Sequence, residues 1–237
     1  RVLEDYSRYD QIGECAGRLE IDGPKIDVEN WWACRDHSWG IRERVGIPEP
    51  VTGIAEAAPQ GGLFAFLFYS TETHGGHVQV AQPAGGPRYL SAAILDRAGG
   101  PALVGRSAAI EADFTDAARP RRMTHVAFDV ETESGARVRL ALDAQGPAVA
   151  MQGWGYGGYA DGLGLGVWRG VRHVETETWD VAHPAEVRYP DGRTDRPVHR
   201  IQPVAVTQHG PAGKVSRGTG SLTFIAEGAL DVLGLAR

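Results

Sequence analysis

The segment 31–40, WWACRDHSWG, contains ionisable and aromatic residues of the types that enzymes use for acid–base catalysis. It contains three of the six Trp residues and places Arg35, Asp36 and His37 in a row. Burial beside an indole raises the pKa of a carboxyl group, and a carboxylic acid that stays protonated near neutral pH can act as a general acid. Indole faces also attract cations. The segment therefore predicts protonation of a carbon–carbon double bond to a carbocation, followed by water capture, proton loss or cyclisation.

If the segment is an extended strand, its side chains alternate between two faces. One face then carries Trp31, Ala33, Arg35, His37 and Trp39, and the other carries Trp32, Cys34, Asp36 and Ser38. We expect Asp36 to face a partly apolar wall and His37 to lie between indoles. Two structural explanations stay open, in which Arg35 and Asp36 form a salt bridge and His37 is a core histidine. A direct pair between Asp36 and His37 would require a bulge, because adjacent side chains point to opposite faces.

The elements that position this segment are predicted to be strands, because hydrophobic residues alternate with a period of two, as in 123–131. Asp22-Gly23, Ser134-Gly135 and Asp191-Gly192 are typical of hairpin turns. Short helices are expected only at 91–97 and 226–235. With 32 Gly and 14 Pro, the chain is predicted to be all-β and antiparallel. Strands are expected at 9–19, 31–39, 52–57, 63–70, 77–82, 88–95, 103–112, 123–131, 149–154, 171–181, 199–207 and 216–225.

Many strands must protect their edges, and closure into a barrel does so completely. A closed barrel of about eight strands encloses an interior that can take a ligand. We expect such a hollow, with Asp36 pointing into it. His173 lies on a polar strand face with Glu175, and that face is either solvated or lines a wet cavity. Trp154 and Tyr156 belong to a Gly-rich segment that can carry aromatic residues over the mouth of the barrel.

Charge and motif content exclude several classes of function. The net charge of −6 and the pI of about 5.8 argue against a nucleic-acid partner. The sequence contains no run of about 18 apolar residues, the length needed to span a membrane as a helix. The His residues show no HxH or HExxH spacing, so neither a metal nor a cofactor is expected. Cys15 and Cys34 are interpreted as buried thiols of a cytoplasmic protein.

The run 8–17, the turn at Asp22-Gly23 and the segment 34–42, CRDHSWGIR, resemble a group of uncharacterised bacterial proteins with an RDHSWG signature. That group resembles a distant branch of the lipocalin-like (calycin-type) superfamily. The superfamily contains carotenoid 1,2-hydratase, AttH-like proteins, kievitone hydratase and certain fungal Diels–Alderases.

The resemblance implies an antiparallel lipocalin-like β-barrel or curved sandwich with little helix, over residues 1–237. It also implies large unsaturated substrates, no redox cofactor, and Asp36, His37 and Trp39 in the cavity. The abrupt start at Arg1 fits a chain whose first lipocalin-like half is incomplete.

The sequence is therefore compatible with two main functions. The first is a cofactor-independent hydratase, lyase, isomerase or cyclase that acts on a hydrophobic terpenoid, polyketide or steroid-like compound. Asp36, His37 and Arg35 would be catalytic. The second is a carrier that binds such a ligand without chemistry, and an accessory role beside another enzyme is a weaker third. A homodimer is compatible with each. The substrate-binding residues are expected to be Trp31, Trp39, Trp154, Tyr156, His173, Tyr9 and Gln11.

Overall fold

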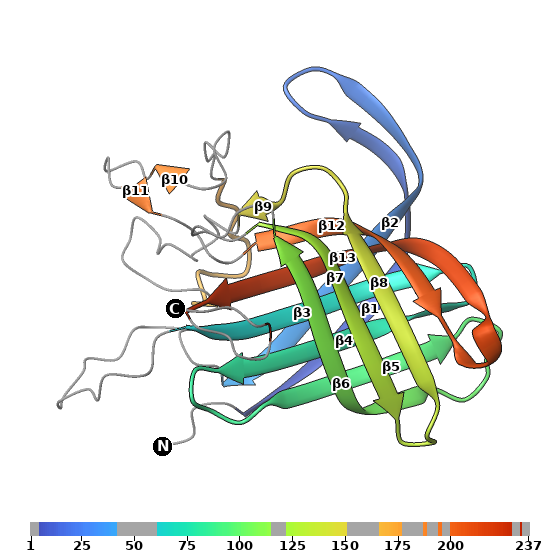
Figure 1. Cartoon of the computed structure of the whole chain (residues 1–237). Coiled ribbons are helices and arrows are strands. Elements are labelled where there is room, and N and C mark those ends of the chain that lie inside the picture. Colours follow the sequence, from blue (N-terminus) through green and yellow to red (C-terminus); the bar gives the residue numbers. More distant parts are fainter. Residues whose placement is uncertain are drawn as a thin grey trace.

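The computed structural model describes residues 5–41, 61–114, 122–150, 166–176, 187–188, 194–195, 200–228 and 233. They form a long two-stranded hairpin, a barrel and a short ribbon (Figure 1). The hairpin is β1 (Asp5–Glu20) and β2 (Lys25–Ile41), and the ribbon is β10 (Val187–Arg188) and β11 (Thr194–Asp195). The remaining strands are β3 (Gly62–Thr71), β4 (His74–Pro83), β5 (Tyr89–Asp96), β6 (Leu103–Phe114), β7 (Met123–Thr132), β8 (Arg137–Ala144), β9 (Val149–Ala150), β12 (Arg200–His209) and β13 (Val215–Glu227).

Eight antiparallel strands close the barrel. Their order is β3-β4-β5-β6-β7-β8-β12-β13, and β13 pairs with β3 to complete the ring. The prediction of an all-β antiparallel barrel is therefore confirmed, and the alternative of a curved sandwich is not what forms. Two of the predicted turns are present, because Gly23 and Gly135 have positive φ angles of 101° and 81° between paired strands. The turn predicted at Asp191-Gly192 lies outside the described residues.

Two predictions of local structure were wrong. Residues 91–97 are not helical, since Ala92 and Ile94 point into the barrel core and β5 pairs with β4 along Tyr89–Asp96. Residues 171–176 form no strand and pair with no other described segment, although their side chains alternate. Val171 and Val174 are almost fully exposed there, so the alternation reflects no buried face. A 3₁₀ turn is formed at Pro211–Gly213, and no α-helix occurs among the described residues. None of these residues forms a helix long and apolar enough to cross a membrane.

The middle of the barrel is filled with side chains. Tyr69, Phe128 and Leu140 are fully buried there together with inward-facing residues of every barrel strand. Cavities of about 270 Å³ and about 700 Å³ lie at the two ends, one lined by Met123 and Phe224 and the other by Ile94. The expected open hollow through the barrel is therefore replaced by a packed core, because bulky residues meet across the axis.

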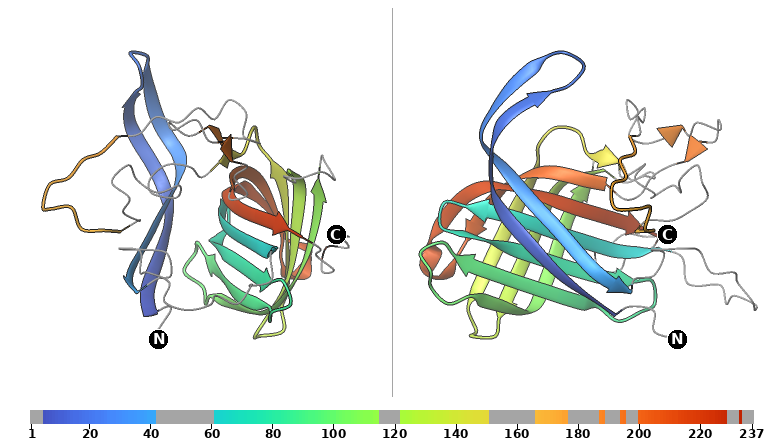
Figure 2. Two further views of the ribbon diagram at one scale, coloured as in Figure 1. Left: turned by 90° about the vertical axis from the view of Figure 1, so that its left-hand side faces the viewer. Right: turned by 180° about the vertical axis from the view of Figure 1, so that it is seen from behind.

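Strand β3 is apolar on both faces, and the hairpin explains why. Leu67 points into the core, but Phe66 and Phe68 point outward and are still only 5% and 8% exposed. The hairpin β1–β2 crosses the outside of the barrel over this face (Figure 2). A strand that is covered on both sides has a continuous apolar sequence rather than an alternating one.

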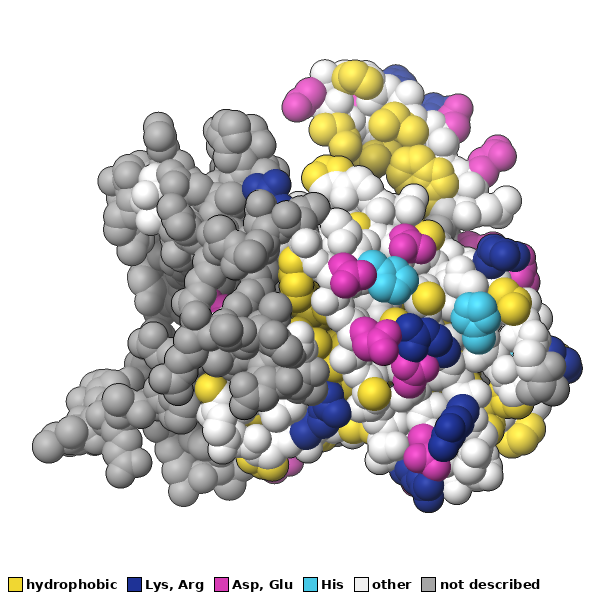
Figure 3. Space-filling view, in the orientation of Figure 1, with side chains coloured by type: hydrophobic (Ala, Val, Ile, Leu, Met, Phe, Trp, Pro, Cys, Tyr) yellow, Lys and Arg dark blue, Asp and Glu magenta, His cyan; other side chains and the backbone are white. Residues whose placement is uncertain are grey.

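The turn end of the hairpin projects beyond the barrel, and hydrophobic side chains gather on it (Figures 1 and 3). Leu19, Ile21 and Ile26 are exposed in this projecting part. Near the point where it leaves the barrel, the register shifts between Cys15 and Gly17.

Replacing a core leucine should therefore destabilise the protein much more than replacing a leucine of the projecting hairpin. We expect Leu140→Ala to lower the free energy of unfolding by about 2–5 kcal/mol, because it leaves a cavity in a packed core. Leu19→Ala, the same change at a 39% exposed site, should cost less than about 1 kcal/mol. Urea titrations measure both values, and equal losses would contradict the assignment of the core to the barrel.

Candidate functional site

The register of the hairpin divides the predicted site between two faces. Tyr9 pairs with His37 and Asp10 with Asp36, so neighbouring pairs point in opposite directions. The face toward the barrel carries Arg8, Asp10, Ile12 and Glu14 with Trp32, Cys34, Asp36 and Ser38, whereas the opposite face carries Tyr9, Gln11, Trp31, Arg35, His37 and Trp39.

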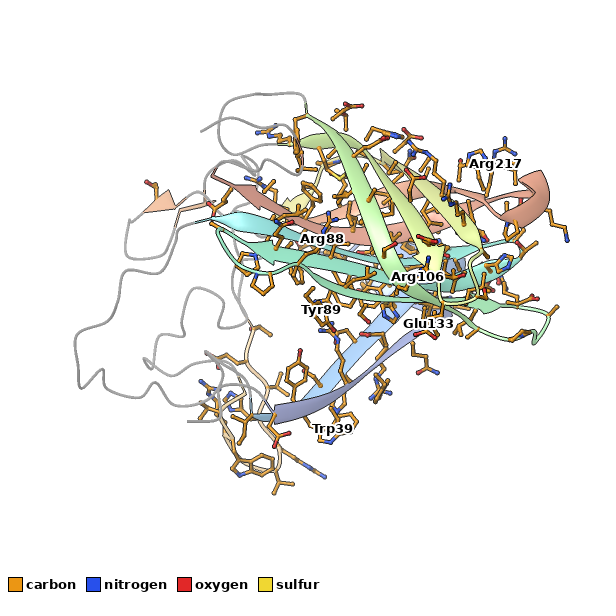
Figure 4. All side chains as sticks on the ribbon, turned by 60° about the horizontal axis from the view of Figure 1, so that its bottom comes forward. Trp39, Arg88, Tyr89, Arg106, Glu133 and Arg217 are labelled. Carbon is orange, nitrogen blue, oxygen red and sulfur yellow. The ribbon has the colours of Figure 1, made fainter. Side chains whose placement is uncertain are left out.

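An aromatic cluster occupies the face directed away from the barrel. The ring centroid of His37 lies 5.4 Å from that of Tyr9 and 5.5 Å from that of Trp39, and the Arg35 guanidinium lies 5.5 Å from the Tyr9 ring. Trp39 is 54% exposed and lies on the outer side of the hairpin (Figure 4). His37 therefore contacts one phenol and one indole rather than two indoles. None of the Tyr9, His37 and Trp39 side chains lines the groove between the hairpin and the barrel.

A chain of charges occupies the face toward the barrel. The Arg8 Nη2 atom donates to Asp36, and Arg8 Nε donates to the Asp10 carboxylate at 3.1 Å. The same guanidinium lies 4.7 Å from the centroid of the Phe66 ring on β3. Arg8 thus joins both strands of the hairpin to the aromatic outer face of the barrel, through two ion pairs and a cation–π contact.

The sequence predicts that Asp36 points into a hollow inside the barrel, and this prediction is wrong. Its side chain is 50% exposed and pairs with Arg8 outside the barrel wall. The Asp36 carboxylate is therefore half-exposed and ion-paired rather than enclosed beside an indole. The acid role of Asp36 stays a prediction.

A groove of about 370 Å³ lies between the hairpin and the barrel wall, and we call it the hairpin–barrel groove. Ile12 and Phe68 supply apolar surface from the two sides, and Asp10 and His77 supply polar groups. Its volume lies within the range of small-molecule sites. The groove is lined by Asp10, Ile12, Gly13, Glu14, Phe68, Ser70, Gly75, Gly76, His77, Ala93, Leu95, Asp96 and Arg97.

His77 is the group in the groove best suited to proton transfer. Burial lowers the pKa of His77 below its ordinary value; the Asp10 carboxylate opposes this effect and the Arg8 guanidinium adds to it. Its Nε2 atom shares a 3.0 Å hydrogen bond with Ser91 Oγ, and no described residue bonds its Nδ1 atom. The imidazole is therefore held by one nitrogen, neutral near pH 7, and able to exchange a proton through the other.

Two glycines bring β4 close to its neighbours beside His77. A Cβ atom added to Gly76 would lie 2.0 Å from the Ala93 carbonyl oxygen, and one added to Gly75 would lie 3.3 Å from the Tyr69 carbonyl oxygen. Glycine at position 76 permits β4 and β5 to approach at this point. His77 and Ser91 lie on these same two strands.

Cys34 contributes no nucleophile to the site. Burial raises the pKa of the Cys34 thiol to about 11, with a further increase from the charges of Asp10 and Asp36 and an opposing effect of Arg8. The thiol therefore stays protonated and unreactive at neutral pH. Cys15, which was predicted to be buried, is exposed, because it lies where the hairpin leaves the barrel.

The structure brings together only part of the predicted set. Asp36 lies on the barrel side of the hairpin, and the six predicted residues of the opposite face lie away from the groove. His173 bonds Glu175 at 3.2 Å in an exposed segment, and Trp154 and Tyr156 lie outside the described residues.

No motif in the sequence singled out Arg8, Asp10 or His77. Arg8 and Asp10 could have been found from the alternation of β1, since they share a face with Asp36 once the two strands are paired at Asp22-Gly23. His77 lies three residues after His74, a spacing that matches neither HxH nor HExxH and so gives no sign of a site. The two imidazoles point to opposite sides of β4, and no group of three or more His, Cys, Asp or Glu residues within the described part of the chain could hold a metal ion.

The fold is a closed antiparallel barrel with an external hairpin, and a groove of about 370 Å³ lies between the two. The chain belongs to a family of unknown function, DUF8625, whose model matches residues 1–211. No curated protein matches the sequence. Among solved structures the chain is similar to kievitone hydratase from Nectria haematococca, with 9% identity and a TM-score of 0.49 over 93% of this chain and 53% of that one. The chain thus spans about half the length of that protein.

His77 should titrate below the ordinary histidine value of 6.5 in long-range ¹H–¹⁵N NMR spectra. Asp10→Asn should lower the pKa of His77 further, because it removes the charge that favours the imidazolium. Arg8→Met should raise it, because it removes the opposing charge. Asp129→Asn, which removes a carboxylate paired with Arg139, serves as the control and should leave His77 unchanged. A titration at the ordinary value in all four proteins would contradict the placement of the hairpin.

Proposed function

We propose that the protein is a cofactor-independent acid–base enzyme of the hydratase, lyase or isomerase type, and that it acts on an apolar unsaturated small molecule in the hairpin–barrel groove. The observation that carries the proposal is the His77 imidazole, which is neutral, oriented by Ser91 and left with an unbonded nitrogen beside an apolar surface. Buried ionisable groups with a shifted pKa that line a cavity are typical of catalytic sites.

The hydrogen bond to Ser91 lets one imidazole serve as base and then as acid. When Nε2–H donates to Ser91 Oγ, the Nδ1 lone pair can accept a proton from water or from a carbon acid. Asp10 stabilises the resulting imidazolium, since its charge raises the pKa of His77. The imidazolium then returns the proton to a neighbouring carbon, so that a hydration or a double-bond shift leaves His77 in its starting state.

Arg8 and Asp36 support this cycle without taking part in it. Arg8 binds Asp10 through Nε and Asp36 through Nη2, which fixes the Asp10 carboxylate next to the groove. Because Arg8 contacts both carboxylates, we assign Asp36 the task of positioning Arg8. The double bonds that suit this mechanism are conjugated to a carbonyl group, because a base-initiated addition places negative charge on the substrate rather than a carbocation.

The carrier alternative has the apolar surface of the groove in its favour. Ile12, Phe68 and Leu95 would hold a hydrophobic ligand whether or not His77 transfers a proton. A carrier does not require an imidazole in the groove, and the partial burial of that polar group costs desolvation free energy. Deuterium exchange separates the two functions, since only an enzyme moves protons between the ligand and the solvent.

A panel of unsaturated terpenoid, polyketide-like and steroid-like ketones should therefore include compounds that are hydrated or isomerised by the protein in D₂O, with solvent deuterium bound to carbon. His77→Gln should slow this reaction at least about 100-fold, the usual contribution of a general acid–base. His125→Gln, on a surface histidine paired with Asp143, should change the rate less than about twofold. Mass spectrometry of the products measures the incorporation. Ligands that bind in the groove and never acquire deuterium would establish the carrier function instead.

A further inference from the structure

A second cavity, independent of the proposed catalytic groove, opens at the end of the barrel where β12 turns into β13. Its volume is about 700 Å³. It is lined by the start of β4, the end of β5, the β5–β6 loop and both sides of the β12–β13 turn. Asp96 borders both spaces, but the groove lies outside the barrel wall and this cavity reaches the inward-facing Ile94.

Gln208 stands out among the residues that line this cavity. It is only 2% exposed, and its Oε1 atom accepts a 3.0 Å hydrogen bond from the hydroxyl group of Tyr69 in the barrel core. No described residue accepts a hydrogen bond from the Gln208 Nε2 atom. This nitrogen is not among the fully buried polar atoms that lack a partner, so it retains access to open space. The amide N–H groups are therefore available to the cavity that Gln208 lines.

Tyr69 fixes the orientation of that amide. The hydroxyl group is deeply buried, and burial raises the pKa of Tyr69, so it stays a neutral donor at every physiological pH. Because the tyrosine donates to Oε1, the amide carbonyl faces the core and the amide nitrogen faces the cavity. A buried amide donor that is held in place but has no acceptor is costly to fold unless water or a ligand completes it.

The surroundings of the amide are mostly apolar. Ile94, Leu103 and Pro101 line one side of the cavity and Val215 the other, and Lys214 lies at the rim. We propose that this end of the barrel is a second binding site, for a small apolar molecule whose carbonyl oxygen accepts a hydrogen bond from the Gln208 amide. The apolar walls bind the body of the ligand, and the amide selects for the acceptor.

Two probes of matched shape test this selection. Acetylnaphthalene carries a carbonyl acceptor, and ethylnaphthalene is the corresponding hydrocarbon. In the native protein both should shift the methyl NMR signals of Ile94 and Leu103. Gln208→Met should weaken the binding of acetylnaphthalene about five- to tenfold, the loss expected for one hydrogen bond, and should change the affinity for ethylnaphthalene less than about twofold.

Two further variants keep the test decisive. Gln82→Met makes the same change on the inward face of β4 at the opposite end of the barrel, where Gln82 pairs with Leu63, and should alter neither affinity. Gln208→Glu keeps an acceptor for the Tyr69 hydroxyl group but removes the amide donor, so it should weaken acetylnaphthalene binding even if Gln208→Met does not fold. Equal acetylnaphthalene affinities in the native protein and the folded Gln208 variants would overturn the proposal. So would the absence of binding, or shifts confined to signals around His77.

Discussion

The packing of the β1–β2 hairpin against the outside of the barrel is the interaction on which the rest of the structure depends. Without the hairpin, the Phe66 and Phe68 rings would face solvent and His77 would lose the charges of Asp10 and Arg8 that act on its pKa. With it, the aromatic face is covered, the imidazole is partly desolvated and a groove with polar groups on both walls is formed. The contact between Arg8 and Phe66 joins hydrophobic burial and charge, since the guanidinium packs on the ring and binds Asp10 and Asp36 at the same time.

The hairpin can hold this position because only part of it leaves the barrel. A two-stranded hairpin alone is marginally stable in water, so strands of 16 and 17 residues need support from another surface. The half that contains Arg8 and Asp36 has that support, whereas the turn half projects from it (Figure 2). The positive φ of Asn30 and the shifted register beside Gly17 lie where the two halves meet. Such a β-bulge bends the strand that contains it. The half that contains Arg8 and Asp36 thus packs on the barrel.

Much of this architecture follows from the sequence, because β-structure leaves local signals. The period of two in 123–131 and the Asp22-Gly23 turn each specify a local geometry that tertiary contacts do not override. The alternation in the RDHSWG segment correctly separated Asp36 from His37. The surface on which the hairpin packs has no such local signal. The continuous apolar run of β3 indicates that both faces of the strand are covered, but it does not indicate which element covers the outer face. The importance of His77 depends on that long-range contact, and so it could not be read from its neighbours in the chain. The strand predicted over 171–181 is not formed in its described part, 171–176, because alternation alone supplies no pairing partner.

The distance between Arg8 and Phe66 tests this account most directly. With the Arg8 Cζ atom 4.7 Å from the centre of the Phe66 ring, the δ protons of Arg8 should show nuclear Overhauser effects to the ring protons and shifts upfield of their usual positions. Both signals should disappear in Phe66→Leu, while the barrel spectrum is retained. Random-coil shifts for the Arg8 δ protons in the native protein, with no cross-peaks to Phe66, would show that the hairpin does not lie on this face and that the groove does not exist.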